Sequence, residues 1–289
     1  MNYSQPNGAS STGPNTSKKP AVQKFGVSIC VSVLLLVACG PSLAQTAAAS
    51  RSLKKCWEYP STNIGERGIS ADDIGVYVPE PGGRVEAVSI DSGSRLWFTD
   101  LGGEIVSDIA GSDSAIYVAA RSSGTNGEQP KASLRSLSKT TGITNWVAGI
   151  PDTTSAFLGL SKGTLISVSG SGVVTAVDAS NGSVRWTVNL NSGITVPPDL
   201  SASEMIVAAE SKEVRVISTD VGATIYSKQS TYRPTAVVLL DDNKAAWGDE
   251  RGNVYLFDTA GQKVIWKIKH GAAISDLASL GDLLLATSN

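Results

Sequence analysis

The chain has 289 residues, and 41% of them are hydrophobic, so one large domain or two small ones can bury a sizeable core. Its 24 basic and 26 acidic residues give a formal net charge of −2, which argues against a nucleic-acid-binding surface. One histidine, His270, and three cysteines leave little material for a histidine-based metal site or catalytic triad.

The first 39 residues are predicted to be an export signal. An apolar run at 25–38 follows a polar segment with three lysines, and its 14 residues are typical of a signal-peptide core rather than a membrane span. The run ends in "LVAC", which resembles the bacterial lipobox, in which the cysteine, here Cys39, receives lipid and becomes the mature N-terminus. Two alternatives are cleavage after Ala44 and an uncleaved anchor at 25–44.

All three alternatives place the remainder of the chain outside the cytoplasm. Removing residues 1–39 removes three lysines and no acidic residue, so the exported part is mildly acidic and is not expected to bind anionic membranes by charge. Residues 40–52 are interpreted as a linker. Cys56 is the only cysteine after the linker, and beside Trp57 it is expected to be a small buried residue.

From Trp57 onward an aromatic residue recurs at gaps of 40, 49, 40, 40 and 40 residues, which indicates a repeat architecture. The series is Trp57, Trp97, Trp146, Trp186, Tyr226 and Trp266. In chain order, the predicted strands are 76–78, 84–90, 94–99, 104–110, 115–120, 155–160, 164–168, 172–178, 183–188, 205–209, 213–218, 235–240, 253–258, 263–268, 272–278 and 282–288. Polar turns are predicted at 70–73, 111–114, 201–204 and 241–244.

These units predict an all-β fold. The predicted strands are rich in Val, Ile and Thr, and no segment sustains a 3.6-residue apolar period, so helices are expected to be nearly absent. Four antiparallel strands in each unit of 40 residues are typical of a β-propeller blade. A parallel β-helix is the main structural alternative, but its repeats are usually shorter. About six repeats are visible, and the last is incomplete.

A glycine stands four residues before each of four members of the aromatic series, at Gly93, Gly142, Gly182 and Gly222. We expect it in a tight turn that needs a positive φ. The indole in the following strand is expected to fill the wedge between two blades and to donate its N–H to a backbone carbonyl. The six aromatic residues are therefore the predicted blade-docking residues. Gly261 stands five residues before Trp266, which predicts a longer turn there.

An alternating strand followed by "VDASNGSVRW" at 177–186, repeated every 40 residues, resembles the PQQ-like repeat of quinoprotein-type propellers over about residues 53–289. Within that family the architecture is similar to that of the BamB lipoprotein of outer-membrane assembly. The resemblance implies a propeller that acts as a non-catalytic, protein-binding scaffold. The same repeat occurs in PQQ-dependent dehydrogenases and in sensor domains, so a degenerate dehydrogenase relative and an extracytoplasmic ligand sensor are the alternatives.

The dehydrogenase alternative requires PQQ beside Ca²⁺ and, in the alcohol dehydrogenases, a vicinal disulfide. The chain has no adjacent cysteines and no Cys-x-x-Cys-His run. Asp108, Asp199 and Asp276 are interpreted as polar channel or turn residues, 241–243 as a solvated turn, and His270 as a loop residue. We therefore predict no catalytic, cofactor-binding or metal-binding residue.

Binding is expected on one face of the propeller. Strand directions alternate, so the turn from the second to the third strand opens on the same face as the loop between blades. The insertion at 121–133 belongs to this face, as do the loops at 151–155, 189–198 and 228–235. Tyr232 and Arg233 are the candidate partner-binding residues. The predicted location is the periplasmic side of a bacterial membrane, with a lipid anchor in the outer membrane and no nucleic-acid partner.

The ends of the repeat region predict an unusual closure. Residues 54–59 have the form of a fourth strand, and 272–278 with 282–288 supply a first and a second strand, but no third strand follows. Two hypotheses fit this pattern: a ring of six blades with a gap, or a piece of a longer propeller of seven or eight blades. The second is favoured because an unpaired apolar strand edge is prone to aggregation.

Overall fold

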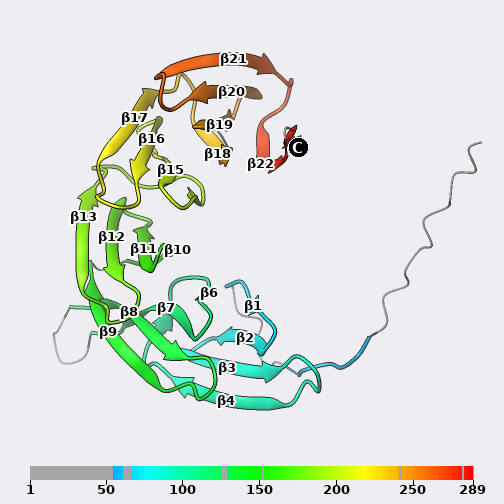
Figure 1. Cartoon of the computed structure of the whole chain (residues 1–289), viewed down its shortest axis with the longest axis vertical. Coiled ribbons are helices and arrows are strands. Elements are labelled where there is room, and N and C mark those ends of the chain that lie inside the picture. The colour runs from blue at the N-terminus through cyan, green and yellow to red at the C-terminus, as the bar shows by residue number, and fades with distance from the viewer. Residues whose placement is uncertain are drawn as a thin grey trace, which may run out of the picture. The chain divides into compact units, whose positions relative to one another are not determined.

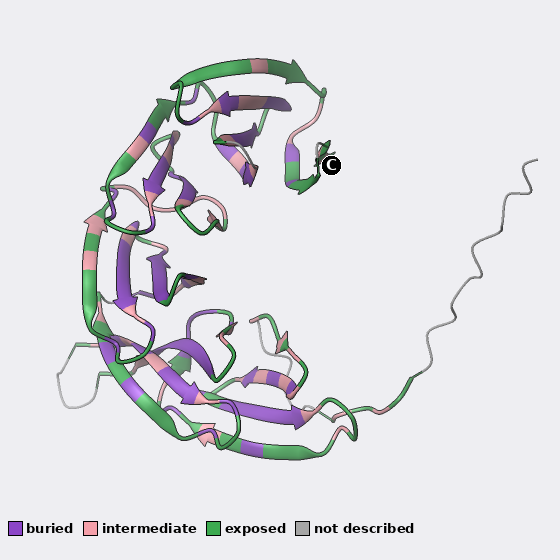
Figure 2. Cartoon of the chain, viewed as in Figure 1, coloured by how far each residue is buried: buried purple, intermediate pink, exposed green. Residues whose placement is uncertain are grey.

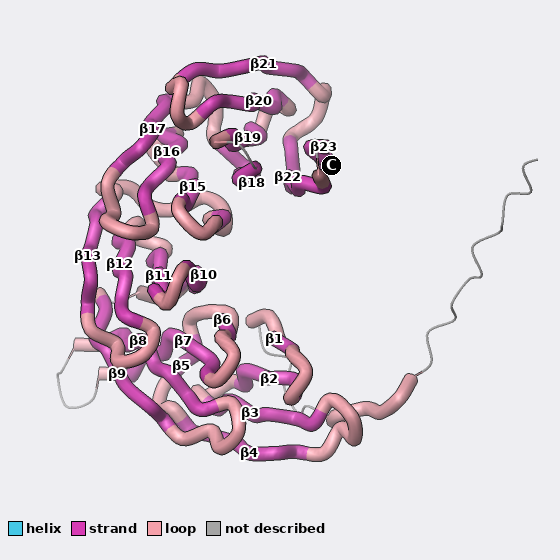
Figure 3. Tube along the Cα trace, viewed as in Figure 1, coloured by secondary structure: helices cyan, strands magenta, loops and turns pink. Residues whose placement is uncertain are grey.

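The computed structural model describes residues 55–60, 67–124, 129–151, 153–240, 243–281 and 283–288. All of them belong to one compact unit, Lys54–Asn289. The predicted signal, Cys39, Ala44 and most of the linker lie outside the described residues, as do 125–128 and the aspartates at 241–242. Every element in the described part of the chain is a strand, which confirms the all-β prediction (Figure 3).

No helix in the described ranges is both long and apolar enough to cross a membrane.

The strands form antiparallel sheets that follow one another in chain order. The first sheet contains β1 (Ser70–Ala71), β2 (Gly75–Glu80), β3 (Arg84–Ser89) and β4 (Arg95–Asp100). The second contains β5 (Glu104–Ile105), β6 (Ala110–Gly111), β7 (Ala115–Ser122), β8 (Lys131–Ser138) and β9 (Thr144–Ile150). The third contains β10 (Ala156–Ser161), β11 (Thr164–Ser169), β12 (Val173–Asp178) and β13 (Val184–Asn189).

The fourth sheet contains β14 (Asp199–Leu200), β15 (Glu204–Ala208), β16 (Glu213–Ser218) and β17 (Thr224–Gln229). The fifth contains β18 (Pro234–Leu240), β19 (Lys244–Asp249), β20 (Asn253–Asp258) and β21 (Lys263–Lys269), and β22 (Ile274–Leu280) pairs with β23 (Leu283–Ser288) as a two-stranded sheet. In each four-stranded sheet the first strand lies innermost and the fourth outermost, which is the arrangement of propeller blades (Figure 1).

The first strand of the second blade differs from the prediction. A single strand was expected at 104–110, but the structure divides it into β5 and β6. Between them the chain pairs with the next blade, where the Ala156 N–H donates to the Val106 carbonyl at 2.7 Å. The Ser107 hydroxyl accepts the N–H of Ala119 at 2.9 Å. Because these groups bond outside the regular ladder, the strand is interrupted there.

The segment before the first blade also differs from the prediction. A fourth strand was expected at 54–59, yet the structure assigns no strand to the described residues 55–59, since no described strand pairs with them. Trp57 nevertheless donates its indole N–H to the Ile90 carbonyl at 2.7 Å. The prediction of a buried Cys56 is wrong, because its side chain is exposed. In an extended segment neighbouring side chains point to opposite sides, so Trp57 takes the inner side and Cys56 the outer one.

The core lies between neighbouring blades, and the fourth strands carry most of the exposed strand residues (Figure 2). Strand β11 is buried along its whole length, whereas β21 is exposed except at Trp266, which is half-buried. Trp247, which is outside the aromatic series, is 1% exposed. Its ring stacks on Tyr255 at 4.4 Å between centroids and meets the edge of Phe257 at 5.1 Å. The fifth blade therefore carries an aromatic cluster that the repeat pattern does not reveal.

Four aromatic residues of the series pack against the glycine turn of the following blade. The indole N–H of Trp97 donates to the Lys139 carbonyl at 2.6 Å, that of Trp146 to Ala179 at 3.0 Å, and that of Trp186 to Thr219 at 3.2 Å. The turn glycines have positive φ: 69° at Gly93, 70° at Gly142, 75° at Gly182 and 71° at Gly222. An added Cβ at these glycines would lie 2.8, 2.5, 2.6 and 2.7 Å from the preceding indole. Glycine is thus required both by the positive φ of the turn and by the close approach of the packed ring.

The turn that contains Gly142 also carries a buried ion pair. Lys139 is 6% exposed, and its ammonium lies 2.5 Å from the Asp72 carboxylate of the first blade. Burial alone would raise the pKa of Asp72, but the hydrogen bond from Lys139 and two backbone N–H groups hold it below its ordinary value. The carboxylate therefore stays charged at neutral pH and balances the buried ammonium.

The predicted longer turn before Trp266 is wrong. The strand pairing there repeats that of the other blades, with Leu256 opposite Trp266 as Ala176 is opposite Trp186. Gln262, not Gly261, has the positive φ of 51° at the fourth position before the tryptophan. At the equivalent position of the other blades, a Cβ would collide with the indole of the preceding blade. In the fifth blade Gln262 occupies this position, and the preceding blade supplies the smaller Tyr226 ring instead of an indole. The two exceptions to the repeat, a tyrosine and a glutamine, therefore meet at one seam.

We expect Tyr226→Trp to be destabilising by about 1–3 kcal/mol, because the larger ring meets the Cβ of Gln262. Gln262→Gly is expected to remove much of this loss, so the two substitutions couple favourably by about 0.5–3 kcal/mol. Urea unfolding of the wild type, both single variants and the double variant measures the coupling. If the changes in unfolding free energy of the two single variants simply added up in the double variant, the sizes of residues 226 and 262 would be independent of each other.

Candidate binding site on the loop face

Turns from the second to the third strand meet the loops between blades on one face of the propeller, here called the loop face. The Ile194 N–H donates to the Gly170 carbonyl at 3.0 Å, the Glu210 N–H to Gly193 at 2.8 Å, and the Glu250 N–H to Arg233 at 3.0 Å. Each bond joins such a turn to the loop before or after its blade. The loop face is therefore held together by backbone hydrogen bonds rather than by loose contacts.

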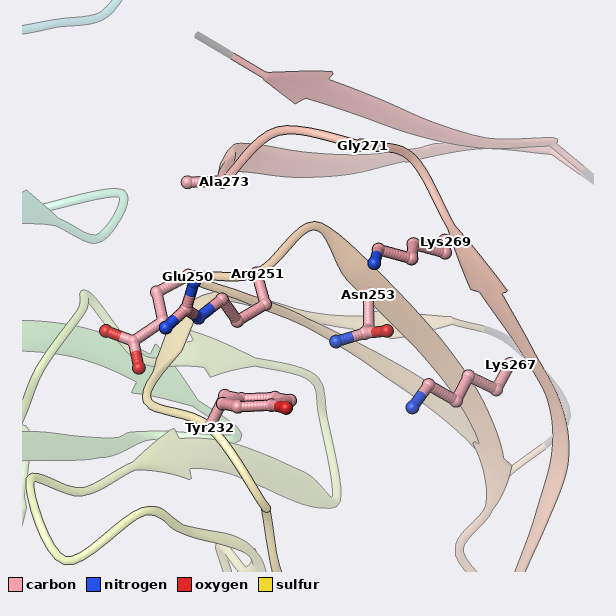
Figure 4. A pocket seen from close by; sticks show the side chains of 8 residues that line it. All are labelled: Tyr232, Glu250, Arg251, Asn253, Lys267, Lys269, Gly271 and Ala273. Atoms are coloured by element: carbon pink, nitrogen blue, oxygen red, sulfur yellow. The ribbon is translucent and has the colours of Figure 1, made fainter.

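The fifth blade forms a cavity of about 610 Å³ on this face (Figure 4). Tyr232 comes from the loop before the blade, Glu250 and Arg251 from the β19–β20 turn, and Lys267 and Lys269 from β21. The remaining lining residues are Asn253 at the start of β20 and Gly271 and Ala273 in the loop after β21. The sequence prediction singled out Tyr232, and the structure places it in this wall, while Arg233 follows it outside the lining.

The base of the cavity is organised by Asp249, which is 0% exposed. Its carboxylate accepts the backbone N–H groups of Arg251 and Asn253, both at 2.9 Å, and the side-chain amide of Asn253 at 2.8 and 3.0 Å. These bonds close the β19–β20 turn and fix the positions from which Arg251 and Asn253 reach the cavity. Asn253 is itself 5% exposed, so its amide is a fixed part of the base.

The walls carry aromatic rings and positive charges. The Arg251 guanidinium lies over the Tyr232 ring at 5.8 Å, and the Lys267 ammonium over the Tyr255 ring at 4.8 Å. The hydrogen bond to Tyr255 and the nearby Asp249 charge hold the pKa of Lys267 above its ordinary value, against the opposing effect of desolvation. Lys267 is therefore fully charged at neutral pH.

The cavity has an excess of positive charge. Arg251, Lys267 and Lys269 face a single acidic lining residue, Glu250, and none of the three cations forms an ion pair within the described part of the chain. Glu250 accepts the Arg233 N–H at a long 3.4 Å. Such an arrangement can bind an anionic group beside an aromatic surface.

The other residues considered from the sequence lie elsewhere. Asp108 accepts the Gly68 N–H at 2.7 Å, and Asp199 accepts the Leu239 N–H at 2.8 Å, so both connect neighbouring blades. Asp276 accepts the N–H of Leu277 at 2.9 Å. His270 lies after β21 with its Nδ1 3.2 Å from the Ser288 hydroxyl. The structure does not bring the three aspartates together, and no group of three metal-ligating side chains occurs among the described residues.

The insertion at 121–133 is described only at its ends. Arg121 and Ser122 extend β7, and 131–133 begin β8, so both strands are longer than their equivalents in the other blades. Residues 125–128 lie outside the described residues.

Four side chains of the cavity were not predicted from the sequence: Arg251, Asn253, Lys267 and Lys269. The signal was present in "WKIK" at 266–269, where two lysines alternate along one strand and must share a face. It was considered only as part of the predicted aromatic strand at 263–268. Nothing in the linear sequence brings that strand to the β19–β20 turn, since this depends on the pairing of β20 with β21.

The successive four-stranded antiparallel sheets define a β-propeller. Residues 46–156 and 130–283 match the PQQ_2 family, which is described as "Outer membrane protein assembly factor BamB". These ranges cover most of the chain, and the chain belongs to this family. The comparison with curated proteins gave no significant match.

Several solved structures are similar. The computationally designed Ika8 protein is 15% identical with a TM-score of 0.63, and the match covers 77% of this chain and 67% of that one. Sqt1 of Saccharomyces cerevisiae is 14% identical with a TM-score of 0.57, over 74% and 65%. BamB from Moraxella catarrhalis is 15% identical with a TM-score of 0.47, over 77% and 91%. At these identities the likeness concerns the fold alone.

Proposed function

We propose that the chain is an exported, non-catalytic scaffold that binds protein partners through the loop face, in a BamB-like role in envelope assembly. In this proposal Cys39 carries the lipid anchor and holds the propeller on the periplasmic side of the outer membrane. The observation that carries the proposal is the cavity of the fifth blade, where the Arg251 guanidinium lies over the Tyr232 ring beside a hydrogen-bonded base. Tyrosine and arginine are the residue types that dominate binding energy at protein interfaces.

Family membership supports the location and the general role, since the family is described as an outer membrane assembly factor. The hydrogen-bonded turns support a preorganised surface, because a partner that docks on it orders few additional loops. The proposal extends to the rest of the loop face, including the insertion at 121–133.

The dehydrogenase alternative is less well supported by the donor set. A Ca²⁺ beside a quinone needs several carboxylate and amide oxygens that converge on one point. Asp108 and Asp199 instead hold backbone N–H groups of neighbouring blades, and the described residues provide no cluster of three acidic, histidine or cysteine side chains. The described residues therefore do not fit a Ca²⁺ ion beside a quinone.

Site-specific photo-crosslinking in living cells tests the scaffold proposal. A photoreactive phenylalanine analogue at Tyr232 is expected to capture a discrete envelope protein. The matched control is the same analogue at Val221, which is 66% exposed in the turn between the third and fourth strands and so faces the opposite side. Equal capture at both positions, or none at Tyr232, would contradict the proposal. Fractionation of Cys39→Ser tests the anchor separately, and its persistence in the membrane fraction would overturn that part.

A further inference from the structure

The cavity of the fifth blade is a positive site on an otherwise acidic chain. Three cations, Arg251, Lys267 and Lys269, line it, whereas the whole chain carries a net charge of −2. The described part of the chain supplies no carboxylate that pairs with any of the three. The lining Glu250 and the buried Asp249 at the base reduce the net positive charge but form no ion pair with the three cations, so an anionic ligand can contact each cation directly.

The cations are arranged in two walls. Lys267 and Lys269 are alternate residues of β21, so they share a face and their Cα atoms are about 6–7 Å apart along the strand. Arg251 stands on the other side of the cavity with Tyr232 (Figure 4). The lysine spacing equals the spacing of alternate side chains in an extended peptide. The guanidinium, held over the ring, offers its planar fork to a carboxylate.

The base of the cavity adds a group of opposite character. The amide nitrogen of Asn253 is bonded to Asp249, and its side-chain oxygen forms no hydrogen bond to any described residue. Asn253 lies between the lysine wall and Arg251 (Figure 4). A sulfate or chloride ion has no proton to donate to this oxygen at neutral pH, whereas a peptide backbone N–H can donate to it. The combination of three cations and one acceptor therefore favours a ligand that carries both carboxylates and N–H groups, as a peptide does, over an aprotic anion.

We propose that this cavity binds an acidic, extended segment of a protein partner, with two alternate carboxylates on Lys267 and Lys269 and a further carboxylate on Arg251. The Asn253 oxygen accepts a backbone N–H of the same segment. This inference rests on the proposed scaffold function and names the chemistry of the partner segment. Anionic lipid and inorganic phosphate are the competing ligands that the test must separate.

The test uses the full-length protein purified from membranes in non-ionic detergent. The probe is a fluorescent decapeptide with glutamates at alternate positions, and its matched control carries glutamines instead. Fluorescence anisotropy is expected to show binding of the glutamate peptide at least about tenfold tighter than that of the glutamine peptide, weakening as sodium chloride is added. Equal binding of the two peptides would overturn the proposal.

Three variants locate the binding. Lys267→Glu and Lys269→Glu are each expected to weaken the glutamate peptide by about tenfold or more. Lys269→Glu is included because Lys267 also contacts Tyr255 and its replacement perturbs packing. Lys263→Glu makes the same charge change on the same strand outside the cavity, and it is expected to have little effect. A loss as large in Lys263→Glu would show that overall charge, not the cavity, attracts the peptide.

Two competitors decide between ligand classes. Neither inorganic phosphate nor vesicles of phosphatidylglycerol are expected to displace the peptide at matched negative charge. Displacement by either would overturn peptide recognition and assign the site to that competitor. The Tyr232 crosslink separates this inference from the scaffold proposal. If the Tyr232 crosslink survives in Lys269→Glu, the scaffold proposal stands and recognition of an acidic segment is overturned. If the peptide binds in vitro but Tyr232 forms no crosslink in cells, peptide binding by the cavity is supported and the scaffold proposal is contradicted.

Discussion

Trp146→Ala is expected to reduce the free energy of unfolding by about 3–5 kcal/mol, the range for deleting a buried tryptophan. The side chain is 9% exposed, lies against the turn of the next blade and donates its N–H to the Ala179 carbonyl. Its removal leaves a cavity between two blades, while the Ala179 carbonyl still accepts from the Tyr117 hydroxyl at 3.2 Å. Trp186→Ala is expected to cost less, because Trp186 is only half-buried.

Chemical denaturation followed by circular dichroism measures this loss. The matched control is Val147→Ala, which removes an apolar side chain that is 56% exposed on the same strand. The control is expected to stay within about 0.5 kcal/mol of the wild type. If Trp146→Ala left the denaturation midpoint unchanged, the repeated aromatic residues would not be the groups that hold the blades together.

Gly182→Ala is expected to cost about 2–5 kcal/mol. An alanine at the φ of 75° loses about 1–2 kcal/mol, since L-residues rarely adopt this conformation. In addition, its Cβ would lie 2.6 Å from a carbon of the Trp146 indole, which forces two blades apart and costs about 1–3 kcal/mol.

Gly163→Ala separates these two contributions. Gly163 has a nearly equal φ of 74°, but an added Cβ there meets no atom within 4 Å. It is therefore expected to show only the backbone cost of about 1–2 kcal/mol. The difference between the two alanine variants, measured by urea unfolding, is the energy of the contact with the ring. Equal losses would mean that the glycines serve the backbone conformation alone.

The sequence predicts much of the fold because its repeat reflects a local requirement. A strand of alternating residues, a turn and a ring recur together, and each unit pairs with itself before it meets its neighbour. The same logic fails where the chain bonds outside its own blade. The split between β5 and β6 depends on Ala156, which belongs to the next blade. The turn at Gln262 depends on Tyr226 in the preceding one.

The candidate site was less predictable for the same reason. Tyr232 was recognised as an interface residue type in a loop of the binding face, and it lies in the cavity wall. Lys267 and Lys269 look like ordinary solvated residues of an outer strand, and Asp249 looks like an ordinary turn residue. Their joint significance arises only when β19, β20 and β21 pair side by side and bring the lysines to the turn.

The aromatic ring of one blade contacts the turn of the next blade, so the propeller is a linear series of coupled units. Each blade contributes a ring to the turn of the next, so the stability of the series is close to a sum of blade terms and nearest-neighbour terms. Opening then begins at the seam with the smallest nearest-neighbour term. The seam between the fourth and fifth blades has the smallest ring of the series, but Tyr226 is 6% exposed and stacks on Phe257 of the fifth blade at 4.6 Å, whereas Trp186 at the preceding seam is only half-buried. Amide hydrogens of the fourth and fifth blades are accordingly expected to exchange together, and a ligand that bridges Tyr232 and β21 would delay the exchange of the fifth blade by fastening it to the loop before it.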